Sequence, residues 1–184
     1  MTRLLNDILL VSALEQTSFI IQPEEVWLAE MMERKAQVYE LQATARKIEF
    51  AYTYRNLADL PGRVSIDRHR IEQVLDNLFE NALRYTPAYR TISLICTYQQ
   101  DVLSFALRDT GYGIAPKDLP HVLEKFYQGK PRPGNKVHTA GGLGLYICKL
   151  FIEKHGGTIA IQNSPGGGCE VTVCLPTTLT QRQS

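Results

Sequence analysis

Residues 76–85 read DNLFENALRY and carry two asparagines, Asn77 and Asn81, four positions apart. The apolar residues around them recur at helical spacing, which predicts a helix from residue 68 to 85 between an N-capping Asp67 and the helix-ending pair Thr86-Pro87. A polar stripe runs beside the apolar face of this helix and comprises Gln73, Asn77, Asn81 and Arg84. The stripe is either an ordinary solvated face or a binding surface, and the helix alone does not decide between them.

The bulk composition restricts the class of protein. The chain has 184 residues, 44% hydrophobic content and a formal charge of +1, which indicates one globular domain with some extra length and no general affinity for nucleic acid or a membrane surface. None of the four cysteines forms a C-x-x-C pair, so neither a zinc site nor a thioredoxin-type motif is indicated. We expect reduced thiols and a cytoplasmic location.

The order of predicted elements indicates an α+β fold. Helices are expected at 2–16, from Pro23 to about 45, at 68–85 and after the glycines at 141–144. Strands are expected at 47–54, 63–67, 91–99, 102–109, 158–164 and 169–176, and residues 115–140 look irregular. This order predicts a two-layer α/β sandwich, in which a mixed, mainly antiparallel sheet carries helices on one face, preceded by a short helical stub.

The polar stripe suits a phosphate-bearing metal. A carboxamide oxygen is a hard, neutral ligand for Mg²⁺, so it binds the metal without adding charge that repels phosphates. Arg84 lies one turn beyond Asn81 and can form a charge-assisted hydrogen bond with a phosphate oxygen. Tyr85, at the edge of the apolar face, is either a core aromatic or a ring that stacks on a base.

Two glycine motifs follow in the chain. In DTGYGI (109–114), Gly111 and Gly113 permit a close backbone approach, and Asp109 can accept a hydrogen bond from an exocyclic amine such as that of adenine; a plain turn is the alternative. GGLGLYICK (141–149) enters a helix, whose free N–H groups suit phosphate oxygens; a glycine hinge without ligand is the alternative.

The segment between these motifs is basic. From residue 125 to 138 it holds Lys125, Lys130, Arg132 and Lys136 and no acid. A basic strip beside a phosphate site is typical of a lid.

Taken together and in this order, the motifs resemble the ATP-binding catalytic domain of sensor histidine kinases in the GHKL superfamily, over about residues 20–176. DNLFENALRYTP resembles the N box, DTGYGI the G1 box, EKFYQG the F box, GGLGLYI the G2 box and PGGGCEV the last glycine box. The resemblance implies a Bergerat-type fold that binds ATP and Mg²⁺ and transfers the γ-phosphoryl group to a histidine.

The resemblance also implies residue roles. Asn81 ligates Mg²⁺, and Asn77 and Arg84 support the metal or the phosphates as the other catalytic residues. Asp109 binds the adenine amino group and Tyr85 stacks near the base. The remaining residues implied to shape the nucleotide pocket and its lid are Gly111, Gly113, Ile114, Lys125, Phe126, Gly142, Leu143, Gly144 and Leu145, with Phe126 as the anchor of the lid.

Two departures from the family pattern stand out, since Ala140 replaces a usual glycine and Cys169 a usual Thr or Ser. Residues 1–16 resemble the end of the dimerisation and phosphoacceptor helix, but the phosphoacceptor histidine motif is absent. We therefore expect a fragment with a connector at 17–22, a catalytic domain at 23–176 and a tail at 177–184. The resemblance implies a monomeric fragment of a full-length kinase that is homodimeric and membrane-bound and acts on its own phosphoacceptor domain and a response regulator.

Three functions compete at this point. They are a histidine kinase, a GHKL-type ATPase or anti-sigma serine kinase, and a degenerate nucleotide-binding or interaction module. The ATPase and serine-kinase branches carry a Glu as general base where this chain has Asn77, and an amide does not accept a proton. Glu80 lies about 100° round the helix from Asn81 and is a poorer base. The residue pattern therefore favours phosphoryl transfer to histidine over hydrolysis.

Overall fold

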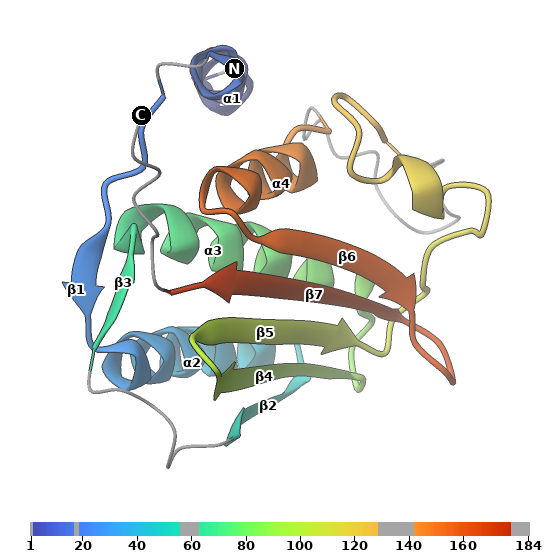
Figure 1. Cartoon of the computed structure of the whole chain (residues 1–184). Coiled ribbons are helices and arrows are strands. Elements are labelled where there is room, and N and C mark those ends of the chain that lie inside the picture. The colour runs from blue at the N-terminus through green and yellow to red at the C-terminus, as the bar shows by residue number, and fades with distance from the viewer. Residues whose placement is uncertain (1, 17–18, 56–62, 129–141, 178–184) are drawn as a thin grey trace.

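The computed structural model describes residues 2–16, 19–55, 63–128 and 142–177 (Figure 1). The elements follow one another in a mixed order of helices and strands, with one short 3₁₀ helix. They are α1 (Thr2–Glu15), β1 (Glu24–Val26), α2 (Leu28–Ala45), β2 (Glu49–Arg55), β3 (Val64–Ile66), α3 (Arg68–Tyr85), β4 (Thr91–Gln99), β5 (Val102–Asp109), η2 (Leu119–His121), α4 (Gly144–Lys154), β6 (Thr158–Asn163) and β7 (Cys169–Pro176).

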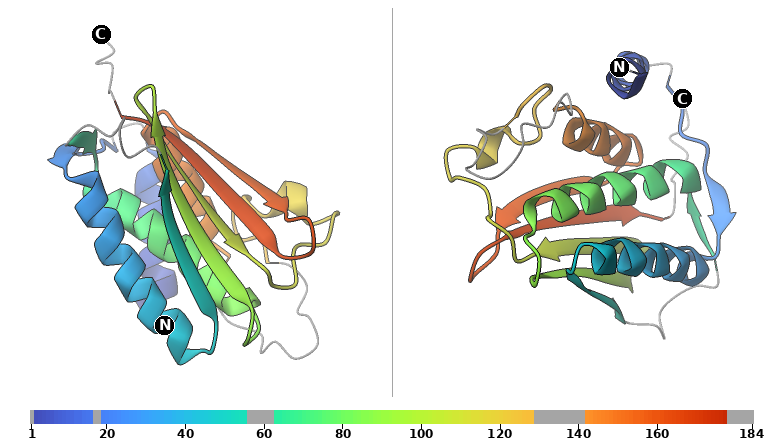
Figure 2. Two further views of the ribbon diagram at one scale, coloured as in Figure 1. Left: turned by 90° about the horizontal axis from the view of Figure 1, so that it is seen from below. Right: turned by 180° about the vertical axis from the view of Figure 1, so that it is seen from behind.

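The main sheet has five strands in the order β2-β4-β5-β7-β6. Strands β2 and β4 are parallel, and every other neighbouring pair is antiparallel. Helices α2, α3 and α4 cover one face of this sheet, as the views from below and from behind show (Figure 2). The predicted α+β sandwich with a mixed, mainly antiparallel sheet is confirmed.

Helix α3 lies at the centre of the helical layer and brings its apolar face into the core. Asp67 caps the helix, since its side chain accepts a hydrogen bond from the Arg70 N–H at 3.1 Å. At the other end the Thr86 hydroxyl donates to the Ala82 carbonyl at 2.7 Å, so both predicted helix ends are confirmed. The buried residues of α3 are Ile71, Val74, Leu75, Leu78, Phe79, Ala82 and Leu83.

The predicted start of the second helix at Pro23 is wrong. Residues Glu24–Val26 form β1, which pairs antiparallel with Val64–Ile66 in a separate two-stranded sheet. Val26 is buried there, and α2 begins only at Leu28. A three-residue strand has too few positions to show alternation, and its partner lies about 40 residues further along the chain. The proline and the two acidic residues that follow it are typical of a helix start, so they led to the wrong prediction.

Helix α1 lies against α4, outside the two layers (Figure 1). Val11 and Leu14 are buried in this contact, whereas Leu5 and Leu9 are exposed. No helix within the described residues is long and apolar enough to cross a membrane. The segment predicted to be irregular holds the short helix η2, and its part from 129 to 140 lies outside the described residues.

Candidate nucleotide-binding site

The C-terminal end of α3 meets the first glycine motif at Gly111. A Cβ atom at this position would overlap the Tyr85 carbonyl oxygen and would lie 2.8 Å from Oδ1 of Asp109. The Tyr112 N–H also points to the Tyr85 carbonyl, at 3.4 Å. The N box and the G1 box are therefore in direct contact, and only glycine fits at residue 111.

Asp109 ends β5 and is buried, with 7% of its surface exposed. Burial raises the pKa of its carboxyl group, and backbone N–H groups of Gly111 and Cys169 lower it in part. The Gly111 N–H donates to Oδ1 at 2.8 Å. A carboxyl group held in this way presents an acceptor of fixed direction beside the helix that carries the two asparagines.

The last glycine turn packs against the same residue from the opposite side. Gly168 has φ +88°, and a Cβ atom there would overlap the Asp109 carbonyl oxygen. Burial and the neighbouring Asp109 raise the pKa of the Cys169 thiol to about 12, so this thiol is neutral at physiological pH. The departure from Thr or Ser at 169 thus places a neutral, weakly polar group beside Asp109.

The G1 loop is pinned at two further points. The Thr110 hydroxyl accepts from the Thr91 N–H at 3.0 Å, and the Thr110 N–H donates to the Thr91 carbonyl at 3.0 Å. At the other end of the loop, the side chain of Asn163 binds both backbone groups of Ile114. Asn163 was not predicted, and no local sequence signal pairs it with a residue 49 positions earlier.

The two asparagines of α3 have different surroundings. The side chain of Asn77 lies beside the thiol of Cys148, a fully buried residue of α4; burial raises the pKa of this thiol to about 12, and the neighbouring Asn77 amide opposes that shift. The thiol itself donates to the Val74 carbonyl at 3.8 Å, which ties α4 to α3. Asn81 is half-buried, and no hydrogen bond joins its side chain to another residue in the described part of the chain. Asn81 is therefore the better candidate for a metal ligand, and Asn77 also has a structural role.

Arg84 is half-buried and Tyr85 is 47% exposed, although both belong to the last turn of α3. Of the two interpretations of Tyr85, the core aromatic is therefore wrong. Its exposed ring is available for stacking on a base, next to the contact between its own carbonyl and Gly111.

A second group of predicted residues gathers where the F box meets the G2 box. Gly142 has φ +66°, and a Cβ atom there would lie 2.6 Å from the Tyr127 carbonyl oxygen. The predicted helix that follows the glycine loop is α4, and it begins at Gly144, the last glycine of the loop. Leu143 is 1% exposed and belongs to the core, and Leu145 packs against that core, so their side chains support the loop from behind.

Lys125 and Phe126 lie at the base of the predicted lid, and their roles towards a nucleotide stay predictions. Phe126 is 53% exposed, so its ring is not an anchor buried among the described residues. Lys125 donates to both carboxylate oxygens of Glu15 at 3.0 Å, and the Tyr146 hydroxyl donates to Glu15 at 2.9 Å. The base of the predicted lid is thus joined to the end of α1. Ala140 and the basic residues 130, 132 and 136 lie outside the described residues.

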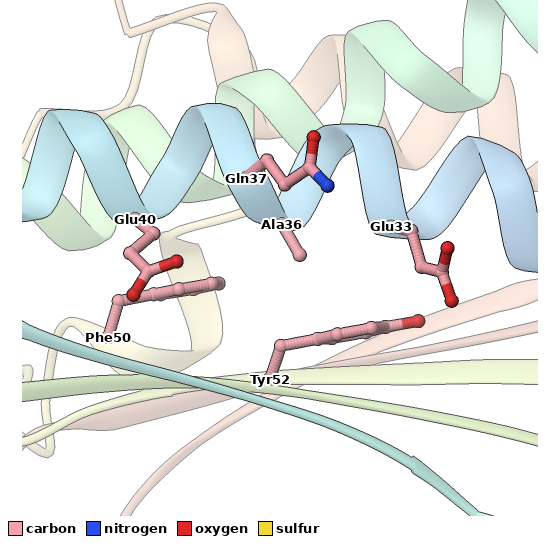
Figure 3. Close-up of a pocket in the computed structure, with 6 residues that line it drawn as sticks. All are labelled: Glu33, Ala36, Gln37, Glu40, Phe50 and Tyr52. Atoms are coloured by element: carbon pink, nitrogen blue, oxygen red, sulfur yellow. The ribbon is translucent and has the colours of Figure 1, made fainter.

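A cleft of about 310 Å³ lies elsewhere, between α2 and β2 (Figure 3). The rings of Phe50 and Tyr52 face α2, which contributes Glu33, Ala36, Gln37 and Glu40 to the lining. None of the predicted site residues lines it. Among the described residues no group of three or more His, Cys, Asp or Glu side chains is placed to hold a metal ion.

Comparison with known proteins identifies the family. The sequence profile of the histidine kinase-, DNA gyrase B- and HSP90-like ATPase family matches residues 66–179. Sensor protein SrrB of Staphylococcus aureus (strain NCTC 8325) is 33% identical over 178 residues, which are 96% of this chain and 29% of SrrB. The chain thus spans less than a third of the length of this relative.

Solved structures show the same fold. Full-length ShkA in complex with AMPPNP has a TM-score of 0.79 and 25% identity, over 94% of this chain and 35% of ShkA. The nucleotide-free catalytic domain of the histidine kinase ThkA has a TM-score of 0.70 and 27% identity, over 85% of this chain and 97% of that domain. The chain therefore belongs to the histidine kinase-, DNA gyrase B- and HSP90-like ATPase family, in which it corresponds to the ATP-binding catalytic domain of a sensor histidine kinase.

Proposed function

We propose that this chain binds ATP with Mg²⁺ between α3, the G1 loop and the start of α4, for transfer of the γ-phosphoryl group to a histidine on a dimerisation and phosphoacceptor domain. The observation that carries the proposal is the contact of Gly111 with Tyr85 and Asp109, because it joins a buried acceptor for adenine to the end of the asparagine-bearing helix.

The residues present fit this nucleotide. Asp109 would accept from the adenine amino group, while the exposed ring of Tyr85 would stack beside the base. Asn81 would supply a neutral oxygen to Mg²⁺, and Arg84 would meet a phosphate oxygen. When bound, Mg²⁺ neutralises charge on the phosphates during transfer. The chain's own contribution is to hold and orient the nucleotide.

Hydrolysis is disfavoured by the surroundings of the two possible bases. The Asn77 amide does not accept a proton, and it lies beside the buried Cys148 thiol. Burial and the neighbouring Asp76 raise the pKa of the Tyr39 phenol on α2, and Glu80 adds a smaller contribution in the same direction. Glu80 therefore lies towards α2, whereas the Asn77 side chain lies beside Cys148 of α4.

The test is calorimetry with a non-hydrolysable ATP analogue, with and without Mg²⁺. We expect Asn81→Ala to abolish the Mg²⁺-dependent part of binding and Asp109→Asn to weaken binding about 10- to 100-fold, the cost of one mismatched hydrogen bond in a buried site. Gln73→Ala is the matched control, because Gln73 is an amide on the same stripe and its partner is Arg70. Unchanged affinity in Asn81→Ala would contradict the proposed metal site.

The partners are part of the same proposal. The acceptor histidine would belong to a phosphoacceptor domain of the full-length kinase, which would be a homodimer and would phosphorylate a response regulator. The exposed apolar residues of α1 support a helical partner for it; they are Leu4, Leu5, Ile8 and Leu9. Incubation of this chain alone with labelled ATP should give no phosphohistidine, and one appearing on the chain would refute this assignment of the acceptor.

A further inference from the structure

Asn163, the last residue of β6, holds the end of the G1 loop by both of its side-chain groups. Its Oδ1 accepts from the Ile114 N–H at 2.7 Å, and its Nδ2 donates to the Ile114 carbonyl at 2.7 Å. These two hydrogen bonds, named the Asn163–Ile114 bridge below, satisfy Ile114 as a neighbouring strand would. An amide is the uncharged side chain that both donates and accepts in this way.

The residues around the bridge are fitted to it. Gly113 has φ +65°, and a Cβ atom there would lie 3.0 Å from Oδ1 of Asn163 and 3.1 Å from the Gly168 carbonyl. Gly168 in turn lies against Asp109, and Thr110 is tied to Thr91. The loop is therefore fixed at its start by Thr91 of β4 and at its end by Asn163 of β6.

We propose that Asn163 is a positioning residue for nucleotide binding, which sets the G1 loop against the adenine site through the Asn163–Ile114 bridge. The inference rests on the proposed function and deepens it. Asn163 does not touch the reacting atoms. Its part is to keep residues 111–114 in the conformation in which Gly111 faces Tyr85 and Asp109.

The bridge acts at the adenine end of the site and not at the metal end. Asp109, Gly111 and Tyr85 are the groups proposed to meet the base, and Asn81 is the proposed metal ligand on the preceding turn of α3. Loss of the bridge should therefore weaken binding by the same factor with and without Mg²⁺. A loss that depends on Mg²⁺ is expected from Asn81→Ala instead.

The first experiment measures ADP affinity by calorimetry on the whole 184-residue chain, with Mg²⁺ and with EDTA. We expect Asn163→Ala to raise the Kd about three- to tenfold in both conditions, since two solvent-accessible hydrogen bonds are lost and the loop becomes mobile. Gln162→Ala is the matched control, because this neighbouring, exposed amide donates to the Glu170 carboxylate at 2.9 Å and not to the G1 loop. Its Kd should equal that of the unchanged protein.

The second experiment separates positioning from general stability. Hydrogen exchange of backbone amides is followed by NMR. Asn163→Ala should speed up exchange of the Ile114 N–H, because this group loses its acceptor. The Thr110 N–H, which donates to the Thr91 carbonyl, should stay protected. Gly113→Ala should weaken ADP binding in the unchanged background. It should cost less in Asn163→Ala, because the contact with Oδ1 has gone.

Each outcome decides the inference. Equal ADP affinity in Asn163→Ala and the unchanged protein would overturn it and leave the proposed function standing. Accelerated exchange at all core amides, or a loss of affinity confined to Mg²⁺, would also overturn it, because Asn163 would then be a general structural or metal-side residue. An unchanged protein that binds no nucleotide would refute the proposed function itself.

Discussion

The substitution Gly111→Ala tests the junction on which the site depends. An alanine Cβ would overlap the Tyr85 carbonyl oxygen and would lie 2.8 Å from the Asp109 carboxylate, and neither backbone nor buried carboxylate yields easily. Forcing a methyl group into such a packed place costs about 1–3 kcal/mol. In a chain of this size that cost lowers the Tm by roughly 2–12 °C. Any shift of Asp109 and Tyr85 reduces nucleotide affinity in addition.

The assays are thermal denaturation and calorimetry with ADP, and the control is the same substitution in the other glycine motif. Gly144 has no atom within 4 Å of an added Cβ and is the first residue of α4. Because alanine favours a helix over glycine by up to about 1 kcal/mol, Gly144→Ala should keep or raise stability. If Gly111→Ala melts and binds like the unchanged protein, the proposed contact between the N box and the G1 box is wrong.

Three further predictions follow from individual groups. Burial lowers the pKa of His155, whose Nε2 accepts from the Asp67 N–H, so the unfolded chain binds a proton more readily than the folded one. The free energy of unfolding should therefore fall as the pH drops below about 6.5, by at most about 1.4 kcal/mol per pH unit. In denaturation curves, His155→Gln should remove this pH dependence, whereas His121→Gln, at an exposed position, should keep it. Burial raises the pKa of Asp109, so ADP affinity should begin to fall at a higher pH than it would with an ordinary aspartate. Asp109→Asn should lack this loss of affinity in acid. Because protonation of a carboxyl group with a raised pKa favours the folded state, unfolding through Asp109 does not explain the loss. Glu15→Gln should tighten binding of an ATP analogue at low salt by releasing Lys125 towards the phosphates, and an effect that persists unchanged at high salt would contradict a role of charge.

The sequence was sufficient for the parts of the fold that local patterns encode. The helical periodicity of α3, its Asp67 cap and its end at Thr86-Pro87 all lie within residues 67–87, and the structure confirms each of them. The alternating strands and a helix entered from the glycines at 141–144 were also correct, although α4 begins at the last of these glycines and not after it. Strand β1 was not predicted, because three residues are too few to show an alternating pattern and its partner strand β3 lies far along the chain.

The candidate site divides in the same way. Residue type and spacing predicted Asn81 and Asp109 as ligand-binding residues and the two glycine motifs as points of close backbone approach, because each of these roles requires particular residues. The structure confirms the close approach at Gly111 and Gly142, and the ligand-binding roles stay predictions. Their assembly was decided by tertiary packing, which alone brought the Tyr85 carbonyl onto Gly111.

Other assignments were decided by the fold alone. Only the tertiary structure showed that Asn77 meets Cys148, that Tyr85 is exposed, and that Lys125 pairs with Glu15. It also revealed Asn163, whose bridge to Ile114 spans 49 residues. The physical reason is that a side chain's chemistry is local to its residue, whereas its partner and its access to solvent depend on which distant segments the fold places beside it.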